Sequence, residues 1–89
     1  MIRPKKSETR RSRKARTTPY QHIYDAFLQK LIAAREASGL TQQEVSERMG
    51  MARSFLSKCE TGERSIDVME LIQLATIYGK EPQEFLLGK

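Results

Sequence analysis

The most informative segment of the chain is residues 41–62, TQQEVSERMGMARSFLSKCETG. Thr41 and Glu44 have the spacing of a capping box, in which each side chain accepts a hydrogen bond from the other residue's backbone N–H. The helix that they open is expected to end at Gly50, and a second short helix is expected over residues 52–60. Two short helices joined by a tight, glycine-containing turn are typical of a helix-turn-helix.

Similar signals bound the helices on either side. Upstream, the segment 18–21 (TPYQ) reads as another capping box with proline in the first helical position, and Gly39 is expected to close that helix. Downstream, Asp67, with Glu70 three residues later, opens a helix that closes at Gly79, and residues 81–84 open a last short one. The apolar positions expected to face the core include Ile23, Tyr24, Phe27, Leu31, Ala34, Val45, Met49, Leu56, Cys59, Phe85 and Leu86.

These patterns predict an all-α fold, a compact domain of five helices over residues 18–89. The strict alternation of a half-buried strand does not occur. The length of 89 residues suits one domain with a modest core.

Positive charge is concentrated in residues 1–19, which hold eight basic side chains and one acidic one, a balance of +7. The other seventy residues hold eight basic and ten acidic side chains, a balance of −2. Residues 1–17 lack apolar periodicity, so we expect a disordered basic arm when no partner is bound. This uneven distribution of charge favours a polyanionic partner, with nucleic acid first and an acidic membrane surface second. The arm lacks the large apolar residues that would anchor it in a membrane.

Several function classes are disfavoured by the residues present. Cys59 is the single cysteine and His22 the single histidine, so neither an internal disulfide nor a zinc site built on these residues is expected. The sequence shows no paired carboxylates, nucleophile with a base, or phosphate-binding loop, and we therefore predict neither an enzyme nor a cofactor. No stretch is long and apolar enough to span a bilayer, and the start lacks an apolar signal region, which favours a cytoplasmic protein.

The expected second helix has the width and chemistry to enter the major groove of DNA. An α-helix fits that groove, where arginine and lysine can donate to guanine, serine can donate or accept, and an apolar group can contact the thymine methyl. Helical periodicity assigns the core side to Leu56 and Cys59. The positions expected to face outwards are Arg53, Ser54, Phe55, Ser57 and Lys58. From the pattern alone, a helical bundle without DNA-binding activity is about equally compatible.

The chain also resembles the lambda-repressor-like family of helix-turn-helix proteins, often called the XRE family. The resemblance covers roughly residues 28–87 and is carried by a series of motifs in fixed order. These are Leu40-Thr41-Gln42 at a helix start, Gly50 in the turn, Ser57-Lys58 followed by Glu60, and Gly62 followed by Arg64. That order and spacing are far more specific than any of the motifs alone.

The resemblance implies roles for individual residues. Base reading falls to Arg53, Ser54 and Lys58, supported by Phe55 and Ala52. Contacts with the DNA phosphates or backbone fall to Gln42, Thr41, Ser57, Thr61 and Arg64. Arg35 and Glu60 are expected to form a structural ion pair. The chain departs from the family at Ala52, where a capping Ser or Thr is usual, so we expect the recognition helix to be completed only on DNA.

Together these features predict a sequence-specific regulator of transcription that binds double-stranded DNA, as a repressor or activator. The family habit of reading palindromes implies a palindromic operator and a homodimer, at least on DNA. Nothing in the sequence identifies the dimer surface, although the last helix near residues 82–87 is a candidate. The alternative is an antitoxin or adaptor that acts mainly through a protein partner.

Overall fold

The computed structural model describes residues 19–86, which form helices and loops without any strand. The all-α fold with five helices is therefore confirmed for this part of the chain. The expected arm over residues 1–17 and the proposed cap at Thr18 lie outside the described residues. The helices in chain order are α2 (Pro19–Ser38), α3 (Gln42–Arg48), α4 (Phe55–Glu60), α5 (Val68–Tyr78) and α6 (Gln83–Leu86).

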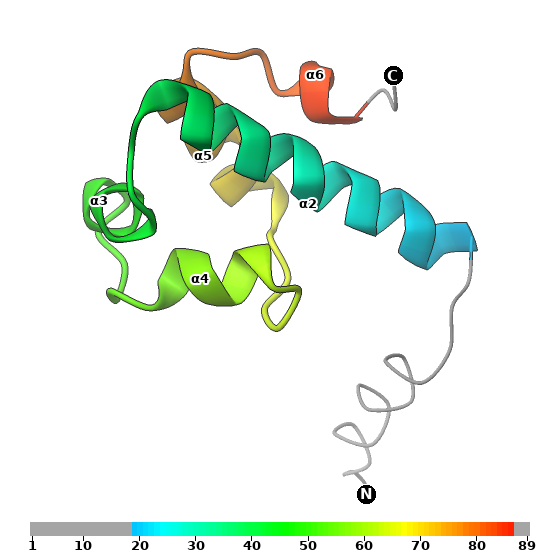
Figure 1. The fold of residues 1–89 in the computed structure, drawn as a ribbon, viewed down its shortest axis with the longest axis horizontal. Coiled ribbons are helices and arrows are strands. Elements are labelled where there is room, and N and C mark those ends of the chain that lie inside the picture. Colours follow the sequence, from blue (N-terminus) through cyan, green and yellow to red (C-terminus); the bar gives the residue numbers. More distant parts are fainter. Residues whose placement is uncertain (1–18, 87–89) are drawn as a thin grey trace, which may run out of the picture.

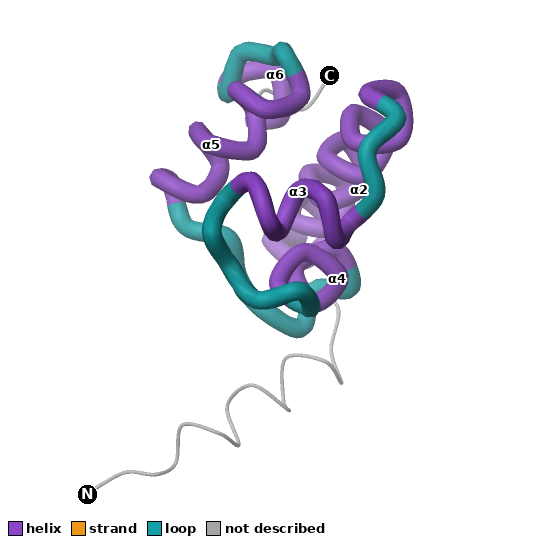
Figure 2. Tube along the Cα trace, turned by 90° about the vertical axis from the view of Figure 1, so that its left-hand side faces the viewer, coloured by secondary structure: helices purple, strands orange, loops and turns teal. Residues whose placement is uncertain are grey.

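The long helix α2 is the scaffold against which the other helices are arranged. It makes contacts with α4, α5 and α6, whereas α3 packs mainly against α4. Figure 1 shows α6 above α2 and α4 below it, and Figure 2 shows the same separation from a second direction. The core lies between these helices and contains Leu31 of α2, Val45 of α3, Leu56 and Cys59 of α4, and Leu74 of α5, all at most 2% exposed.

The two downstream capping boxes form as the sequence predicted. At the start of α3, the Thr41 hydroxyl accepts from the Glu44 backbone N–H at 3.0 Å, and the Glu44 carboxylate accepts from the Thr41 N–H at 2.8 Å. At the start of α5, Asp67 and Glu70 make the same reciprocal pair at 2.8 and 3.1 Å. These pairs satisfy backbone donors that have no partner within their helices, so they define where α3 and α5 begin.

Two apolar residues that were expected to face the core are exposed instead. Ile23 on α2 is 67% exposed and Leu86 on α6 is 61% exposed. Both line an open groove between the first half of α2, the start of α5 and α6. The helical periodicity was correct for Leu31 and Ala34 further along α2, where α4 and α5 cover the helix. It was wrong at Ile23 because no described helix covers the apolar face of α2 near its start.

Candidate nucleic-acid interface

Helices α3 and α4 form the helix-turn-helix, but α4 begins later than the sequence suggested. Residues 52–54 form a turn closed by a hydrogen bond from the Phe55 N–H to the Ala52 carbonyl at 2.9 Å, and regular helix starts at Phe55. Ser54 takes the N-cap position, yet its side chain makes no capping hydrogen bond. The expected helix over residues 52–60 is therefore a turn followed by a helix of six residues.

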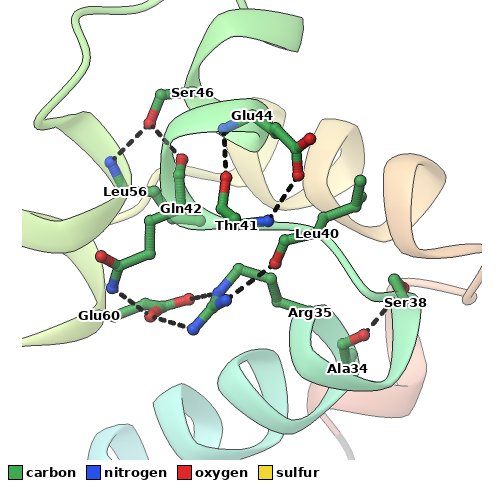
Figure 3. A network of polar contacts seen from close by, with 10 residues as sticks. All are labelled: Ala34, Arg35, Ser38, Leu40, Thr41, Gln42, Glu44, Ser46, Leu56 and Glu60. Atoms are coloured by element: carbon green, nitrogen blue, oxygen red, sulfur yellow. Dashed lines mark hydrogen bonds and ion pairs between the residues drawn. The ribbon is translucent and has the colours of Figure 1, made fainter.

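The missing cap is replaced by a residue of the preceding helix. Ser46 of α3 is completely buried, and its hydroxyl accepts from the Leu56 backbone N–H at 3.1 Å. The same hydroxyl donates to the Gln42 carbonyl one turn earlier at 3.0 Å, as Figure 3 shows. One side chain thus satisfies a donor in the first turn of α4 and ties it to α3. The expectation that α4 lacks a cap has to be corrected, since the cap comes from across the turn.

The other end of α4 is held by a network around Glu60. Arg35 of α2 donates from Nε to Glu60 Oε2 at 2.8 Å and from Nη2 to Oε1 at 3.2 Å. Gln42 of α3 donates from Nε2 to the same Oε1 at 2.7 Å, and Arg35 Nη1 also donates to the Leu40 carbonyl at 2.9 Å (Figure 3). The Glu60 carboxylate raises the pKa of Arg35 above its ordinary value. The expected Arg35–Glu60 ion pair therefore joins α2 to α4, and the Gln42 hydrogen bond adds α3 to the network.

A second guanidinium packs against the start of α4. The Arg64 guanidinium lies over the Phe55 ring, 4.8 Å from its centroid, and makes two parallel hydrogen bonds of 2.8 and 2.9 Å to the Glu70 carboxylate. This pairing lowers the pKa of Glu70. Phe55 itself is only 4% exposed, so the expectation that it faces outwards was wrong.

The three polar residues assigned to base reading are exposed. Arg53 and Ser54 lie in the turn before α4, and Lys58 lies on the helix itself. Ala52 is exposed at the start of the same turn. The Arg53 guanidinium is also held, because Nη2 donates to Oε1 of Gln43 on α3 at 3.2 Å. The anchored helix α4 and the turn before it thus present two cations and a hydroxyl, which are suitable donors for base edges.

The residues assigned to the DNA backbone are divided between exposed and engaged side chains. Thr41 is exposed at the start of α3, and Thr61 is exposed after α4, where its hydroxyl donates to the Lys58 carbonyl at 3.1 Å. Ser57 is half-buried and donates to the Ser54 carbonyl at 3.1 Å. Gln42 and Arg64, by contrast, already bind the carboxylates described above. These two residues stabilise the fold around α4 in the free protein.

Two residues of the site were missed by sequence reasoning. Gln43 was not singled out, because a glutamine on an exposed helix position gives no signal of a partner ten residues away. The sequence gives only a weak indication that Ser46 is buried. It directly follows the core residue Val45 on a short helix, so its side chain lies near the buried face. Cys59 is buried as expected, and burial raises the pKa of its thiol, so it is a core residue.

Residues 19–86 hold no candidate for a metal site or a membrane-spanning helix. No group of three or more His, Cys, Asp or Glu side chains that could hold a metal ion occurs among them. Over the same residues, none of the helices combines the length and the apolar character needed to cross a membrane.

Comparisons with known proteins agree with this geometry. A family model described as a helix-turn-helix matches residues 31–85. The uncharacterized HTH-type transcriptional regulator y4dJ of Sinorhizobium fredii (strain NBRC 101917 / NGR234) is 42% identical over 45 residues, which make up 51% of this chain and 58% of that protein. The matched part thus spans little more than half of that relative.

A solved structure gives a longer match. An XRE-family like protein from Pseudomonas syringae pv. tomato str. DC3000 has a TM-score of 0.71 and 39% sequence identity, covering 75% of this chain and 82% of that one. The helix-turn-helix model accounts for more than half of the chain, and this neighbour for most of the fold. The chain therefore belongs to the XRE family of helix-turn-helix DNA-binding domains, a family of transcriptional regulators and not of enzymes.

Proposed function

We propose that this chain binds double-stranded DNA at specific sequences and regulates transcription, with α4 and the turn before it in the major groove. The observation that carries the proposal is the exposure of Arg53, Ser54 and Lys58 on a segment whose two ends are tied to the rest of the domain. Ser46 fixes the first turn of α4 and Glu60 fixes the last. Such anchoring orients the donors before binding, which reduces the entropy lost on the DNA.

Arg53 is the main specificity residue in this proposal. A guanidinium can donate two parallel hydrogen bonds to O6 and N7 of guanine, and each such pair contributes about 1–3 kcal/mol of discrimination between bases. Lys58 adds a further donor to guanine acceptors, and Ser54 can donate to or accept from several bases. Ala52 is small enough to allow the turn to approach the base edges closely.

Backbone contacts would fix the register of α4 in the groove without reading sequence. Thr41 and Thr61 are exposed at the two ends of the helix-turn-helix, and Ser57 lies between them. Gln42 can hold Glu60 and contact a DNA phosphate at the same time, because its amide has a second N–H besides the one that binds Glu60. For Arg64 we propose a supporting role at most, since its guanidinium already binds Glu70.

The basic residues of segment 1–17 would supply much of the affinity, because they carry the positive charge that residues 20–89 lack. We further propose that two copies bind a palindromic operator, as a repressor or activator in the cytoplasm. A two-fold protein reads two half-sites about 34 Å apart along one face of the DNA.

The test is a selection from random duplex DNA with the wild-type chain, Arg53→Ala and Arg48→Ala. Arg48 is exposed on α3 outside the base-reading positions, so Arg48→Ala removes the same charge as the matched control. We expect the wild type and Arg48→Ala to recover the same palindrome, and Arg53→Ala to lose preference at one base of each half-site. Recovery of no common sequence by the wild type would contradict the proposal, as would unchanged preference in Arg53→Ala.

A further inference from the structure

The guanidinium of Arg53 is bound by a residue of the preceding helix. Its Nη2 donates to Oε1 of Gln43 at 3.2 Å, and Gln43 is exposed on the first turn of α3. Helices α3 and α4 lie next to each other in both views (Figures 1 and 2), and the hydrogen bond crosses the turn that joins them. Gln43 thus holds the side chain of the main reading residue in the free protein.

The backbone at both ends of this hydrogen bond is fixed. The capping pair of Thr41 and Glu44 encloses Gln43 at the start of α3. The turn that carries Arg53 is closed by its own backbone hydrogen bond of 2.9 Å. The remaining freedom lies in two long side chains, and ordering such side chains costs entropy. When Gln43 holds Arg53 beforehand, less of that entropy is lost on the DNA.

The Gln43 amide holds Arg53 without cancelling its charge. Arg35 and Arg64 instead bind carboxylates, each at 2.8 Å. A carboxylate partner offsets the positive charge that would otherwise be attracted to the phosphates of DNA. The oxygen of an amide accepts a hydrogen bond but has no net charge. Arg53 is therefore oriented and still carries its full charge towards the groove.

The hydrogen bond to Gln43 also leaves Arg53 able to make a bidentate contact. A guanidinium has five N–H donors in a rigid arrangement, with Nε and Nη2 along one edge and Nη1 and Nη2 along another. The two protons of Nη2 belong to different edges, and Gln43 Oε1 takes one of them. One edge with two donors remains complete, and such an edge matches O6 and N7 of guanine.

We propose that Gln43 is a positioning residue for base reading, which holds the Arg53 guanidinium in the orientation that contacts guanine. The proposal rests on the reading role of Arg53 in the proposed function and adds a residue of α3 to it. Without the Gln43 oxygen, only a fraction of the molecules has Arg53 ready for guanine, and the apparent affinity for guanine falls by that fraction. A duplex with a different base at this position does not use the orientation, so its affinity stays the same.

The test compares the wild type with Gln43→Met, which keeps the length of the side chain but has no amide. Two dissociation constants are measured for each, one for the selected duplex and one for the same duplex with the guanine read by Arg53 changed to adenine. Their ratio should be about 2- to 10-fold smaller for Gln43→Met, the contribution of one hydrogen bond. The urea midpoint should not change, because Gln43 is exposed. Gln73→Met, at an exposed position of α5, is the matched control and should keep the wild-type ratio.

Gln43→Glu separates positioning from a general effect on DNA binding. It keeps an acceptor oxygen at the same distance from the backbone, so the ratio should be close to that of the wild type. The added negative charge should weaken binding to both duplexes alike, because both carry the same phosphates. A ratio as low as that of Gln43→Met would contradict a positioning role for the oxygen.

Combination with Arg53→Ala shows through which residue Gln43 acts. In that background, Gln43→Met should leave the dissociation constant of the selected duplex unchanged, because no guanidinium remains to be positioned. A further loss of affinity would show that Gln43 contacts the DNA itself and would overturn the proposal, as would a wild-type ratio in the single variant Gln43→Met. Both results leave the reading role of Arg53 intact. A wild-type ratio in Arg53→Ala would instead refute that role and this proposal together.

Discussion

Ser46→Ala removes one hydroxyl group from the interior of the domain and tests how α4 is positioned. The wild-type hydroxyl accepts from the Leu56 N–H at 3.1 Å and is completely buried. Without it, the Leu56 N–H has no replacement from Ser54, whose side chain makes no capping hydrogen bond. The variant therefore isolates the contribution of one cap that comes from a neighbouring helix.

The expected decrease in stability follows from two effects of opposite sign. Leaving a buried backbone donor unsatisfied costs about 1–3 kcal/mol. Alanine is a better helix former than serine by about 0.5 kcal/mol, which offsets part of that cost within α3. The free energy of unfolding should thus fall by about 0.5–2.5 kcal/mol, and the melting temperature by about 2–20 °C for a domain of this size.

Urea unfolding followed by circular dichroism measures this difference. Ser57→Ala is the matched control, because its hydroxyl donates to the Ser54 carbonyl at a half-buried position where solvent can replace it. The control should lie within about 0.5 kcal/mol of the wild type. Equal stability of Ser46→Ala and Ser57→Ala would mean that the start of α4 does not depend on the buried hydroxyl, contrary to the cap described above.

Three further predictions concern the Glu60 network, the α5 cap and the arm. Arg35→Ala should lower the free energy of unfolding in urea by about 3–5 kcal/mol, because it leaves the Glu60 carboxylate, 7% exposed, without its cation. A larger effect on base preference than on stability in urea would argue against a structural role for Arg35. The Arg64 guanidinium lowers the folded-state pKa of Glu70 below the ordinary 4.5. The stability that the ionised Glu70 contributes is therefore complete above about pH 4.5 and is lost as the pH falls through the folded-state pKa. Glu70→Gln should therefore be less stable than the wild type at pH 7 and approach it on acidification, whereas a constant difference in urea titrations from pH 7 to 3 would contradict the coupling. Deletion of residues 1–17 should leave thermal unfolding unchanged and weaken binding to all duplexes. It should also reduce the slope of log K against log salt concentration by about 0.9 for each phosphate that the arm neutralises. An identical slope for the truncated and full chains would show that the arm neutralises no phosphate.

The sequence predicted the parts of the fold that depend on local chemistry. Thr41 with Glu44, and Asp67 with Glu70, satisfy donors within three residues, so their spacing alone locates the starts of α3 and α5. Gly79 closes α5 in the left-handed conformation with a φ of 71°, which glycine adopts at little cost. These boundaries needed no knowledge of the tertiary structure.

The failures occurred where tertiary contacts decide. Phe55 was placed outwards although it lies one helical turn before the buried Cys59, on the same face of α4. The loop after α4 covers its ring with the Arg64 guanidinium, a contact that spacing within the helix does not reveal. Ile23 and Leu86 have the spacing of core residues, but no described helix covers them. Ser46 could not be found by spacing, because its partner Leu56 is ten residues away across the turn.

Whether α4 reads a specific sequence can be decided by the ratio of two dissociation constants. They are measured at one physiological salt concentration, one for the duplex recovered by selection and one for a scrambled duplex of the same length and base composition. We predict at least about 10³-fold tighter binding to the selected duplex, as specific complexes show. Equal affinities would mean that the chain binds DNA through charge alone and would contradict a reading role for Arg53, Ser54 and Lys58.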